Sequence, residues 1–503
     1  MTRLRRPAAT GAQLRSWVTQ WDMGLVVVCG AAAVFATGLI WLCLLRYDAF
    51  STARFDLGNM VQALWNTAHG NFLETTDSSG QQISRLGSHV DPILALFAPL
   101  WWIWPTPKML LVAQPLIVAT GALPVYWIGR RWLGDWRVAA ACAGVYLLYP
   151  PLQWAVLFDF HPVTLATPLL LWCIWAIEEN RPVWLAVCAS LSLVTKEEVG
   201  LAIAGLGLWV LVRHRRTRTA LFLILAGLVW TALCVAVIIP HFAPGGESPF
   251  IARYGELGTS PSTIARSLVT HPVHTAALLV SGARLTYLFE LLAPLLFLSL
   301  LSPLLLLWVV PELLINMLTK DPYQYSIYYQ YTSVVTPFLI VGMIGGLARI
   351  RRLPGVIGRV SRMPAVCVVV LLGAGIVSGY RLGPLPFWQH IPGGSSRQVR
   401  QFTVTAHDRA LARATALVPG GVPISASNQL GGRLSARRRV LVWPVIDDAQ
   451  WVLVDTQRAW LIDKPVKPRV QEPYLKALER NRAFTLVFDE DGVLVFARKA
   501  ALR

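Results

Sequence analysis

Long apolar stretches separated by polar loops run through most of the chain. A helix that crosses a bilayer needs about 20 consecutive, mostly apolar residues. Stretches near this length predict about eleven spans, which lie at 24–45, 107–128, 138–157, 162–178, 183–195, 198–212, 219–239, 285–300, 303–318, 333–348 and 364–380. The pattern therefore predicts an α-helical polytopic membrane domain over residues 1–380.

Composition supports this interpretation. Of the 503 residues, 55% are hydrophobic and 14% are charged, against roughly 25% charged in soluble domains, and the mean hydropathy is +0.52. These values exclude a soluble globular protein and a disordered chain. The net charge of +18 indicates cytoplasmic loops and contacts with lipid phosphates, not nucleic acid. Abundant Arg, Ala, Pro and Trp suggest a GC-rich bacterial genome. We expect a multi-pass protein of a bacterial plasma (inner) membrane.

Three arginine clusters indicate which loops face the cytoplasm, because cytoplasmic loops carry an excess of positive charge. The clusters lie at 130–137, 213–218 and 349–362. All three reach the same side only if 183–212 forms two short helices and not one long helix. Four arginines precede the first span without a cleavage site after it, which predicts an uncleaved helix and a cytoplasmic N-terminus; they are Arg3, Arg5, Arg6 and Arg15.

The residues after about Arg381 differ in kind from the rest. Short strand-like runs lie at 423–427, 440–443, 451–455, 484–488 and 493–497, and helical patterns lie near 408–417 and 472–482. This alternation predicts a small α/β domain over 381–503. By the parity of the spans, this domain is extracytoplasmic.

Unusual polar residues collect in the predicted outer loops 46–106, 158–161, 195–198, 240–284 and 319–332. Such groups are costly near hydrocarbon unless they are paired or face a wet cavity. The second and third loops are very short, yet they carry Asp, His, Lys and two Glu. We therefore expect one outward-facing site, although loops that are simply wet and polar are the alternative. The candidates are Asp56, His89, Asp91, Asp159, His161, Lys196, Glu197 and Tyr254.

Several candidates also have an ordinary structural interpretation. Asp56 is either a general base or the N-cap of an interfacial helix over 57–68. His89 and His161 stand at or near helix starts, where a capping or hydrogen-bonded histidine is common. Lys196 either binds a phosphate as a point charge or pairs with Glu197 or Glu198.

No local spacing demands a metal ion, so no cofactor is required by the sequence. His89, Asp91, Asp159, His161 and Glu197 could nevertheless hold a divalent cation between them. The seven cysteines lie in apolar stretches and form no CxxC pair, so we interpret them as buried small hydrophobic residues.

Several motifs resemble the family of bacterial membrane proteins known as domain of unknown function 2079, which is related to the GT-C membrane glycosyltransferases. They are FDLGNMVQALWN (55–66), SHVDPILALFAPLW (88–101), AQPLIVATGALPVYWIGRR (113–131), YPPLQWAVLFDFHP (149–162), TKEEVGL (195–201) and YGELG (254–258). The resemblance implies a GT-C-like fold with an acidic base in the first outer loop, where Asp56 stands, and a second acidic residue at Asp159. The chain departs from the GT-C pattern at Leu57, where an adjacent acid is usual. It also has Gln330 where the family's tyrosine-rich loop is expected to carry a histidine.

The resemblance implies an inverting glycosyltransferase that moves a sugar from a polyprenyl-phosphate donor to an envelope glycan or glycolipid acceptor on the outer face. A carboxylate deprotonates the acceptor, and cations stabilise the departing phosphate. We assign catalysis to Asp56, His89, Asp159 and His161, phosphate binding to Arg54, Lys196 and Arg284, and substrate binding to Asp91, Glu197 and Tyr254.

Two other functions fit the same pattern. A lipid-linked sugar transporter or flippase often has a broken helix with charges at the membrane midplane, and 183–212 fits that description if Lys196 lies deep. A non-catalytic scaffold that presents the C-terminal domain is the other alternative, in which the outer acids should not converge.

Overall fold

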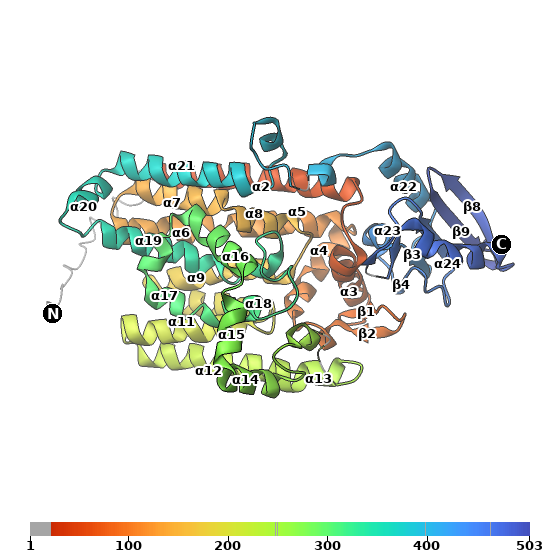
Figure 1. Ribbon diagram of the computed structural model, residues 1–503, viewed down its shortest axis with the longest axis horizontal. Helices are drawn as coiled ribbons and strands as arrows, with labels where there is room; N and C mark the ends of the chain where they lie inside the picture. Colours follow the sequence, from red (N-terminus) through yellow and green to blue (C-terminus); the bar gives the residue numbers. More distant parts are fainter. Residues whose placement is uncertain (1–21, 247, 249, 398, 463, 503) are drawn as a thin grey trace.

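The computed structural model describes residues 22–246, 248, 250–397, 399–462 and 464–502. It is a mostly helical body with a small sheet region at one end (Figure 1). The predicted N-terminal arginines, Arg3 to Arg15, lie outside the described residues, so the sidedness they imply stays a prediction.

Four helical segments are long and apolar enough to cross a membrane, judged by length and composition within the described residues. They are α2 (Met23–Asp48), α5 with α6 (Lys108–Leu133), the segment of α12, η5 and α13 (Thr217–Phe242), and α21 (Pro364–Leu382). Two bent pairs raise the number to six if each is one span: α7 with α8 (Trp136–Leu148 and Pro150–Leu157) and the pair Pro272–Leu279 and Gly282–Leu295. The predicted number of about eleven spans stays a prediction.

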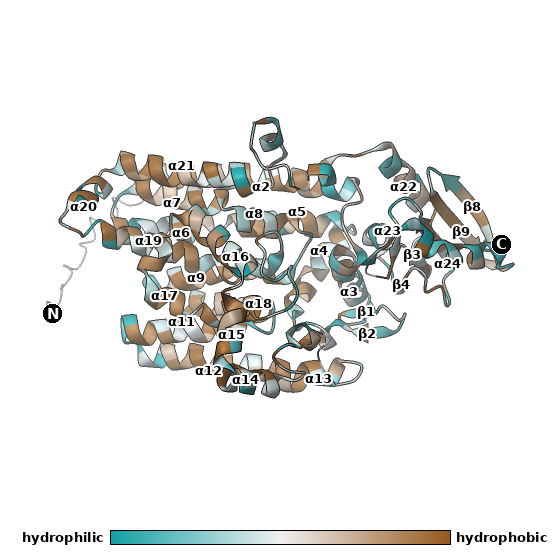
Figure 2. Ribbon diagram, viewed as in Figure 1, coloured by the Kyte–Doolittle hydropathy of each residue, from teal (hydrophilic) through white to brown (hydrophobic). Residues whose placement is uncertain are grey.

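Shorter apolar helices fill most of the remaining predicted positions. They are Pro162–Glu178, α10 (Pro182–Leu193), α11 (Val199–His214) and α19 (Thr336–Ile350). A further short apolar helix, Pro92–Ile103, lies where no span was predicted. α10 and α11 are separate helices, as the positions of the basic loops had predicted. The ribbon of the helical body is coloured mostly as hydrophobic residues (Figure 2). α12 exposes Phe222, Leu225 and Val229, as a lipid-facing helix would.

The chain departs from the predicted helices between 282 and 317. Two spans were expected there, at 285–300 and 303–318, but the segment breaks into α16 (Gly282–Leu292), η7 (Ala293–Leu295), η8 (Leu298–Leu301), α17 (Pro303–Leu307) and α18 (Val310–Met317). Pro294, Pro303 and Pro311 explain the breaks, because proline lacks an amide hydrogen and clashes with the carbonyl four residues earlier. The apolar composition of this segment concealed its interruptions.

The three basic loops lie together at the end of the body away from the sheet (Figure 1). Glu178 is the last residue of α9 (Ala166–Glu178). Its carboxylate forms an ion pair with Arg131 at 3.0 Å and lies 3.1 Å from Nε2 of His214. Arg351 donates to the carbonyl of Leu133 at 2.7 Å. This grouping supports the prediction that the loops share one side of the membrane.

Shorter elements cover the opposite end. They include η1 (Arg54–Gly58), α3 (Asn59–Ala68), the hairpin of β1 (Glu74–Thr76) and β2 (Gln82–Ser84), η2 (Arg85–Gly87), η3 (Pro92–Phe97) and α4 (Ala98–Ile103). η4 (Pro162–Leu165), η6 (Ile251–Tyr254), α14 (Pro261–Thr270), α15 (Pro272–Leu279), η9 (Gln330–Thr332), α20 (Val356–Ser361), η10 (Pro386–His390) and η11 (Val399–Phe402) connect the larger helices.

Residues 406–498, called here the C-terminal α/β region, contain a five-stranded sheet in the order β4-β3-β5-β9-β8. The strands β3 (Ile424–Ala426), β4 (Val440–Val442) and β5 (Trp451–Asp455) are parallel, and β8 (Phe484–Glu490) and β9 (Val493–Arg498) add antiparallel partners. Alternate residues of β5 enter two apolar clusters, one with α22 (Ala406–Ala416) and α23 (Asn428–Leu434) and one with α24 (Pro468–Arg480). A small ladder joins β6 (Trp460–Leu461) and β7 (Lys464–Pro465), and η12 (Lys499–Ala501) follows β9. All five predicted strands and both predicted helices are present; the boundary at 381 stays a prediction.

Candidate active site

A cavity of about 590 Å³ lies between the loops at the sheet end of the helical body. Five of the ten residues predicted to form the site line it: Asp56, His89, Asp91, His161 and Lys196. The other five lie behind its wall or away from it. Residues from all five predicted outer loops thus line one cavity, as the short polar loops had suggested.

Asp56 faces His161 across the cavity wall. Its Oδ1 lies 3.4 Å from Nε2 of His161, and 31% of the Asp56 side chain is exposed. Nδ1 of His161 lies 2.9 Å from the carbonyl oxygen of Phe158. Because a carbonyl can only accept, Nδ1 carries the hydrogen, and Nε2 is left to exchange a proton with the carboxylate or with a ligand. The pair therefore forms an accessible carboxylate–imidazole dyad.

Asp159 lies behind this dyad and does not line the cavity. It is 2% exposed, pairs with Arg46 at 3.1 Å, and accepts hydrogen bonds from the amides of Ala53 at 3.2 Å and Leu57 at 3.3 Å. Ala53 directly precedes η1, and Leu57 follows Asp56 within it. Asp159 also has a φ of +53°, a left-handed conformation that costs energy in a non-glycine residue. The geometry gives Asp159 a positioning role in place of the predicted catalytic one.

The alternative interpretation of Asp56 as a helix N-cap is wrong. The backbone turns from π-helix η1 directly into α3, and the two caps are Ala53 and Gly58. The amides of Ala53 and Leu57 donate instead to Asp159, from a loop about 100 residues away in sequence. The carboxylate of Asp56 is therefore left free for the cavity.

His89, which lines the same cavity, forms a second dyad with Glu197, which does not line it. Nδ1 of His89 lies 2.9 Å from Oε1 of Glu197, whose Oε2 accepts from the amide of Val90 at 2.9 Å. Burial raises the pKa of Glu197, but His89, Lys196 and the Val90 amide outweigh it and bring the pKa to about 2. Burial also lowers the pKa of His89 below its usual value, and Glu197 only partly offsets this. Glu197 thus fixes the ring orientation, and Nε2 is the nitrogen left for a cavity ligand.

This dyad predicts an acid-sensitive fold. A carboxyl group with a folded-state pKa near 2 stabilises the fold above its unfolded value of 4.5, and this stabilisation is lost as pH falls from 4.5 toward 2. His89 acts in the same direction, because its lowered pKa favours the neutral form that exists above its unfolded value of 6.5. When the pH is lowered from about 5 to about 3, the melting temperature of Glu197→Gln should therefore fall less than that of wild type. Equal losses in the two proteins would contradict this assignment.

Lys196 keeps its charge at the cavity wall. Its Nζ pairs with Glu198 at 2.6 Å and lies 5.9 Å from the ring centre of Tyr331. Burial lowers the pKa of Lys196, but Glu198 and Glu197 outweigh it and raise the pKa above its usual value. The predicted ion pair is thus present, with Glu198 as the partner; Lys196 also lines the cavity, and its binding of a phosphate stays a prediction.

The other predicted phosphate ligands are occupied elsewhere. Nη2 of Arg54, which is 2% exposed, donates to the carbonyls of Thr76 at 2.5 Å and Val440 at 2.7 Å. Arg284 donates to the carbonyls of Met317 and Thr319. Neither arginine lines the cavity, so their assignment to a donor phosphate is corrected.

Two arginines that the sequence analysis missed do line the cavity. Arg253 lies 3.4 Å from Asp321, and Arg85 forms a 2.6 Å pair with Asp91. Arg253 directly precedes the YGELG motif, and Arg85 lies six residues before Asp91, so loop proximity was the only available signal. Asp91, predicted to bind substrate, is thus neutralised by Arg85.

Tyr254 and the predicted metal ligands are also engaged within the protein. The Tyr254 hydroxyl donates to the carbonyl of Ile315 at 3.0 Å and does not line the cavity. Asp91, Asp159 and Glu197 each pair with a different partner. Across the part of the chain that the structure describes, no group of three or more His, Cys, Asp or Glu side chains is placed to hold a metal ion.

Comparisons with known proteins agree with the fold. The family model described as "Predicted membrane protein (DUF2079)" matches residues 46–495. The crystal structure of ArnT from Cupriavidus metallidurans in the apo state has a TM-score of 0.51 at 15% identity, covering 97% of this chain and 99% of that one. The same protein bound to undecaprenyl phosphate gives 0.50 at 14% identity with the same coverage. No curated protein matches the chain.

A more distant likeness is to the oligosaccharyltransferase of Archaeoglobus fulgidus, in complex with Zn and sulfate. Its TM-score is 0.45 at 12% identity, covering 86% of this chain and 68% of that one. At these identities the ArnT structures establish the fold alone. The chain therefore shares the fold of the ArnT structures, as the predicted GT-C-like fold implied, whereas the number and topology of the spans stay predictions.

Proposed function

This chain belongs to the DUF2079 family of predicted membrane proteins, and we propose that it is a glycosyltransferase that uses a polyprenyl-phosphate sugar as donor. The acceptor is an envelope glycan or glycolipid, and transfer takes place on the outer face of the bacterial plasma membrane. The observation that carries the proposal is one cavity lined by an accessible carboxylate–imidazole dyad and by the cation Lys196.

The reaction needs a base and an anion site. Asp56 takes the proton from the acceptor hydroxyl, directly or through His161, as the hydroxyl oxygen attacks the anomeric carbon of the sugar. The bond from that carbon to the phosphate oxygen breaks, and the polyprenyl phosphate leaves with the electron pair. Lys196 and Arg253 stabilise the charge that develops on this phosphate. A single displacement inverts the anomeric centre.

Two features favour the enzyme over the alternatives. The cavity is lined by Lys196 together with Asp77 of the β1–β2 hairpin, which supports a position near the end of the helical body instead of the midplane expected for a transporter. The outer acids Asp56 and Asp91 converge on the same cavity, which a scaffold would not require. The related fold of ArnT, which was crystallised with undecaprenyl phosphate, supports a lipid-phosphate donor.

The proposal is tested by offering the purified protein a panel of polyprenyl-phosphate sugars with membrane glycan and glycolipid acceptors. Release of polyprenyl phosphate together with sugar on the acceptor is expected. A deletion strain should accumulate the donor and lack the product. Movement of the intact donor across liposome membranes, without any transfer, would instead establish the transporter.

Lys196 offers a separate test of the donor site. Lys196→Gln removes a charge-assisted contact worth roughly 1.5–3 kcal/mol, so the KM for the lipid-linked donor should rise by roughly 10- to 100-fold. The acceptor KM should change little. Lys108→Gln is the control, because Lys108 pairs with Asp48 at the surface and does not line the cavity. Equal effects of both changes on the donor KM would remove Lys196 from the donor site.

A further inference from the structure

The first turn of η1, which carries Asp56, is held by acceptors from two distant parts of the chain. Asp159 accepts from the amides of Ala53 and Leu57. Oδ1 of Asn428, the first residue of α23, accepts from the amides of Arg54 at 2.9 Å and Phe55 at 3.3 Å. Helix starts leave several amides unsatisfied, and here a helical-body residue and a C-terminal residue satisfy two each.

Asn428 is placed for this contact by the sheet. It follows β3, the central parallel strand, and is 4% exposed. The carboxyl end of such a strand, where neighbouring connections run to opposite sides, is the usual ligand position in α/β folds. In this protein the position is filled by the protein's own Asp56 loop.

α23 and the Asp56 loop approach so closely that side chains are excluded between them. A Cβ at Gly431 would lie 2.7 Å from the Arg54 side chain, and one at Gly432 would lie 3.0 Å from Oγ1 of Thr52. On the other side, a Cβ at Gly58 would lie 2.6 Å from Oγ of Ser435. Three glycines at one contact indicate a fitted interface, because a methyl group at any of them would force its neighbours to shift.

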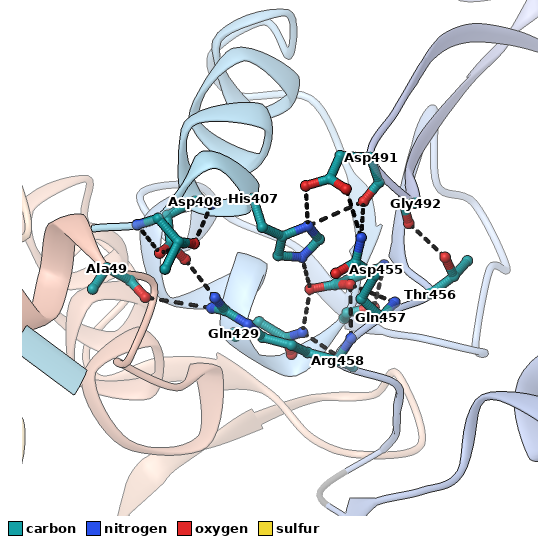
Figure 3. Close-up of polar contacts among 12 residues, drawn as sticks. Ala49, His407, Asp408, Gln429, Asp455, Thr456, Gln457, Arg458, Asp491 and Gly492 are labelled. Carbon is teal, nitrogen blue, oxygen red and sulfur yellow. Dashed lines mark hydrogen bonds and ion pairs between the residues drawn. The ribbon is translucent and has the colours of Figure 1, made fainter. Parts of the chain in front are cut away.

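Further contacts fix the chain just before the loop. Arg433 donates to the carbonyl of Tyr47 at 2.9 Å, and Arg458 reaches the carbonyl of Ala49 at 3.4 Å while pairing with Asp408 at 2.8 Å. Figure 3 shows the network that holds Arg458 in place.

At the centre of that network, Asp455 accepts from the amides of Gln457 and Arg458, both at 2.9 Å, and lies 3.1 Å from Nε2 of His407. The side chain of His407 is largely buried, and its Nδ1 lies 3.0 Å from the carbonyl of Asp491. The turn that carries Arg458 is thus built from β5, α22 and the β8–β9 turn together. The contacts that hold residues 47–55 in place therefore depend on the folded sheet.

We infer that the C-terminal α/β region holds η1 in the position that the site requires, and that Asn428 is a positioning residue for the base Asp56. This rests on the proposed function only for its catalytic consequence; the positioning itself is measurable without turnover. Release of the Arg54 and Phe55 amides would let η1 shift, and misplacing a base by about 1 Å can cost about 10²-fold in rate.

The test compares Asn428→Ala with Asn428→Asp. Alanine removes the acceptor, whereas aspartate keeps an oxygen in the same place. Hydrogen exchange at residues 53–57 should accelerate in Asn428→Ala and stay slow in Asn428→Asp. Turnover should fall by roughly 10-fold or more in the alanine variant with the donor KM nearly unchanged, and aspartate should restore it. Asn481→Ala is the matched control, because Asn481 accepts from the amide of Ala483 elsewhere in the same region.

The outcomes separate the two proposals. Wild-type exchange in Asn428→Ala overturns the positioning inference, and so does accelerated exchange with unchanged turnover. Faster exchange in a protein whose wild type transfers no sugar overturns the proposed function and leaves the positioning intact. If Asn428→Ala does not fold, Asn428→Leu, which keeps the side-chain volume without an acceptor, takes its place.

Discussion

Asp56→Asn should lower turnover by roughly 10²-fold or more, because the amide has no basic lone pair to accept the acceptor's proton. The fold should survive, since Asp56 makes no capping contact and its side chain is 31% exposed. Asp56→Glu moves the carboxylate by about one methylene and should also lose most activity. The measurement is sugar transfer from a polyprenyl-phosphate donor by protein whose melting temperature matches wild type.

Asp135→Asn is the matched control for this change. Asp135 caps α7 at the opposite end of the helical body, and asparagine caps a helix about as well as aspartate, so its turnover should equal that of wild type. Near-normal turnover in Asp56→Asn would move the base to one of the two cavity histidines, His161 or His89. Normal turnover with alanine at each of Asp56, His161 and His89 would contradict the enzyme proposal and favour the scaffold.

The helical body was largely predictable from the sequence, because each helix is specified by the residues within it. An apolar run of sufficient length specifies a helix whatever it packs against. The exception is 282–317, where the prolines override the apolar pattern. In the C-terminal α/β region, the strands were found from their short apolar runs, while α23 was missed because NQLGGRL has two glycines and only two leucines. The two glycines, Gly431 and Gly432, are needed because the Asp56 loop packs closely against them, a contact that the local sequence does not reveal.

The location of the site could be predicted from the sequence, but the role of each residue in it could not. Membrane sidedness alone puts Asp56, His89, His161 and Lys196 into one group. Pairings depend on contacts between residues far apart in sequence, so the sequence could not tell that Asp159 turns inward to Arg46. For the same reason Arg54, although adjacent to Phe55 of the motif, could not be recognised as a residue buried between two carbonyls.

The role of Asp159 is itself open to measurement. Asp159→Ala removes the anionic partner of a buried ion pair, leaving two amides without their acceptor and Arg46 with neutral acceptors only. Removing one partner of such a pair lowers the free energy of unfolding by roughly 3–5 kcal/mol. A large drop in melting temperature is therefore expected, measured in detergent or lipid discs. Glu490→Ala, which breaks the exposed pair with Arg413, should change the melting temperature little.

A double-mutant cycle separates positioning from catalysis. If Asp159 acts through Arg46 and η1, Arg46→Ala combined with Asp159→Ala should destabilise the fold by less than the sum of the single changes, by roughly 0.5–3 kcal/mol. Asp159→Asn keeps an oxygen for the two amides but loses the charge, so it should melt between wild type and Asp159→Ala and keep part of its turnover. An Asp159→Asn protein that melts like wild type but transfers no sugar would restore Asp159 to the reacting groups, since only the loss of its carboxylate chemistry would then explain the defect.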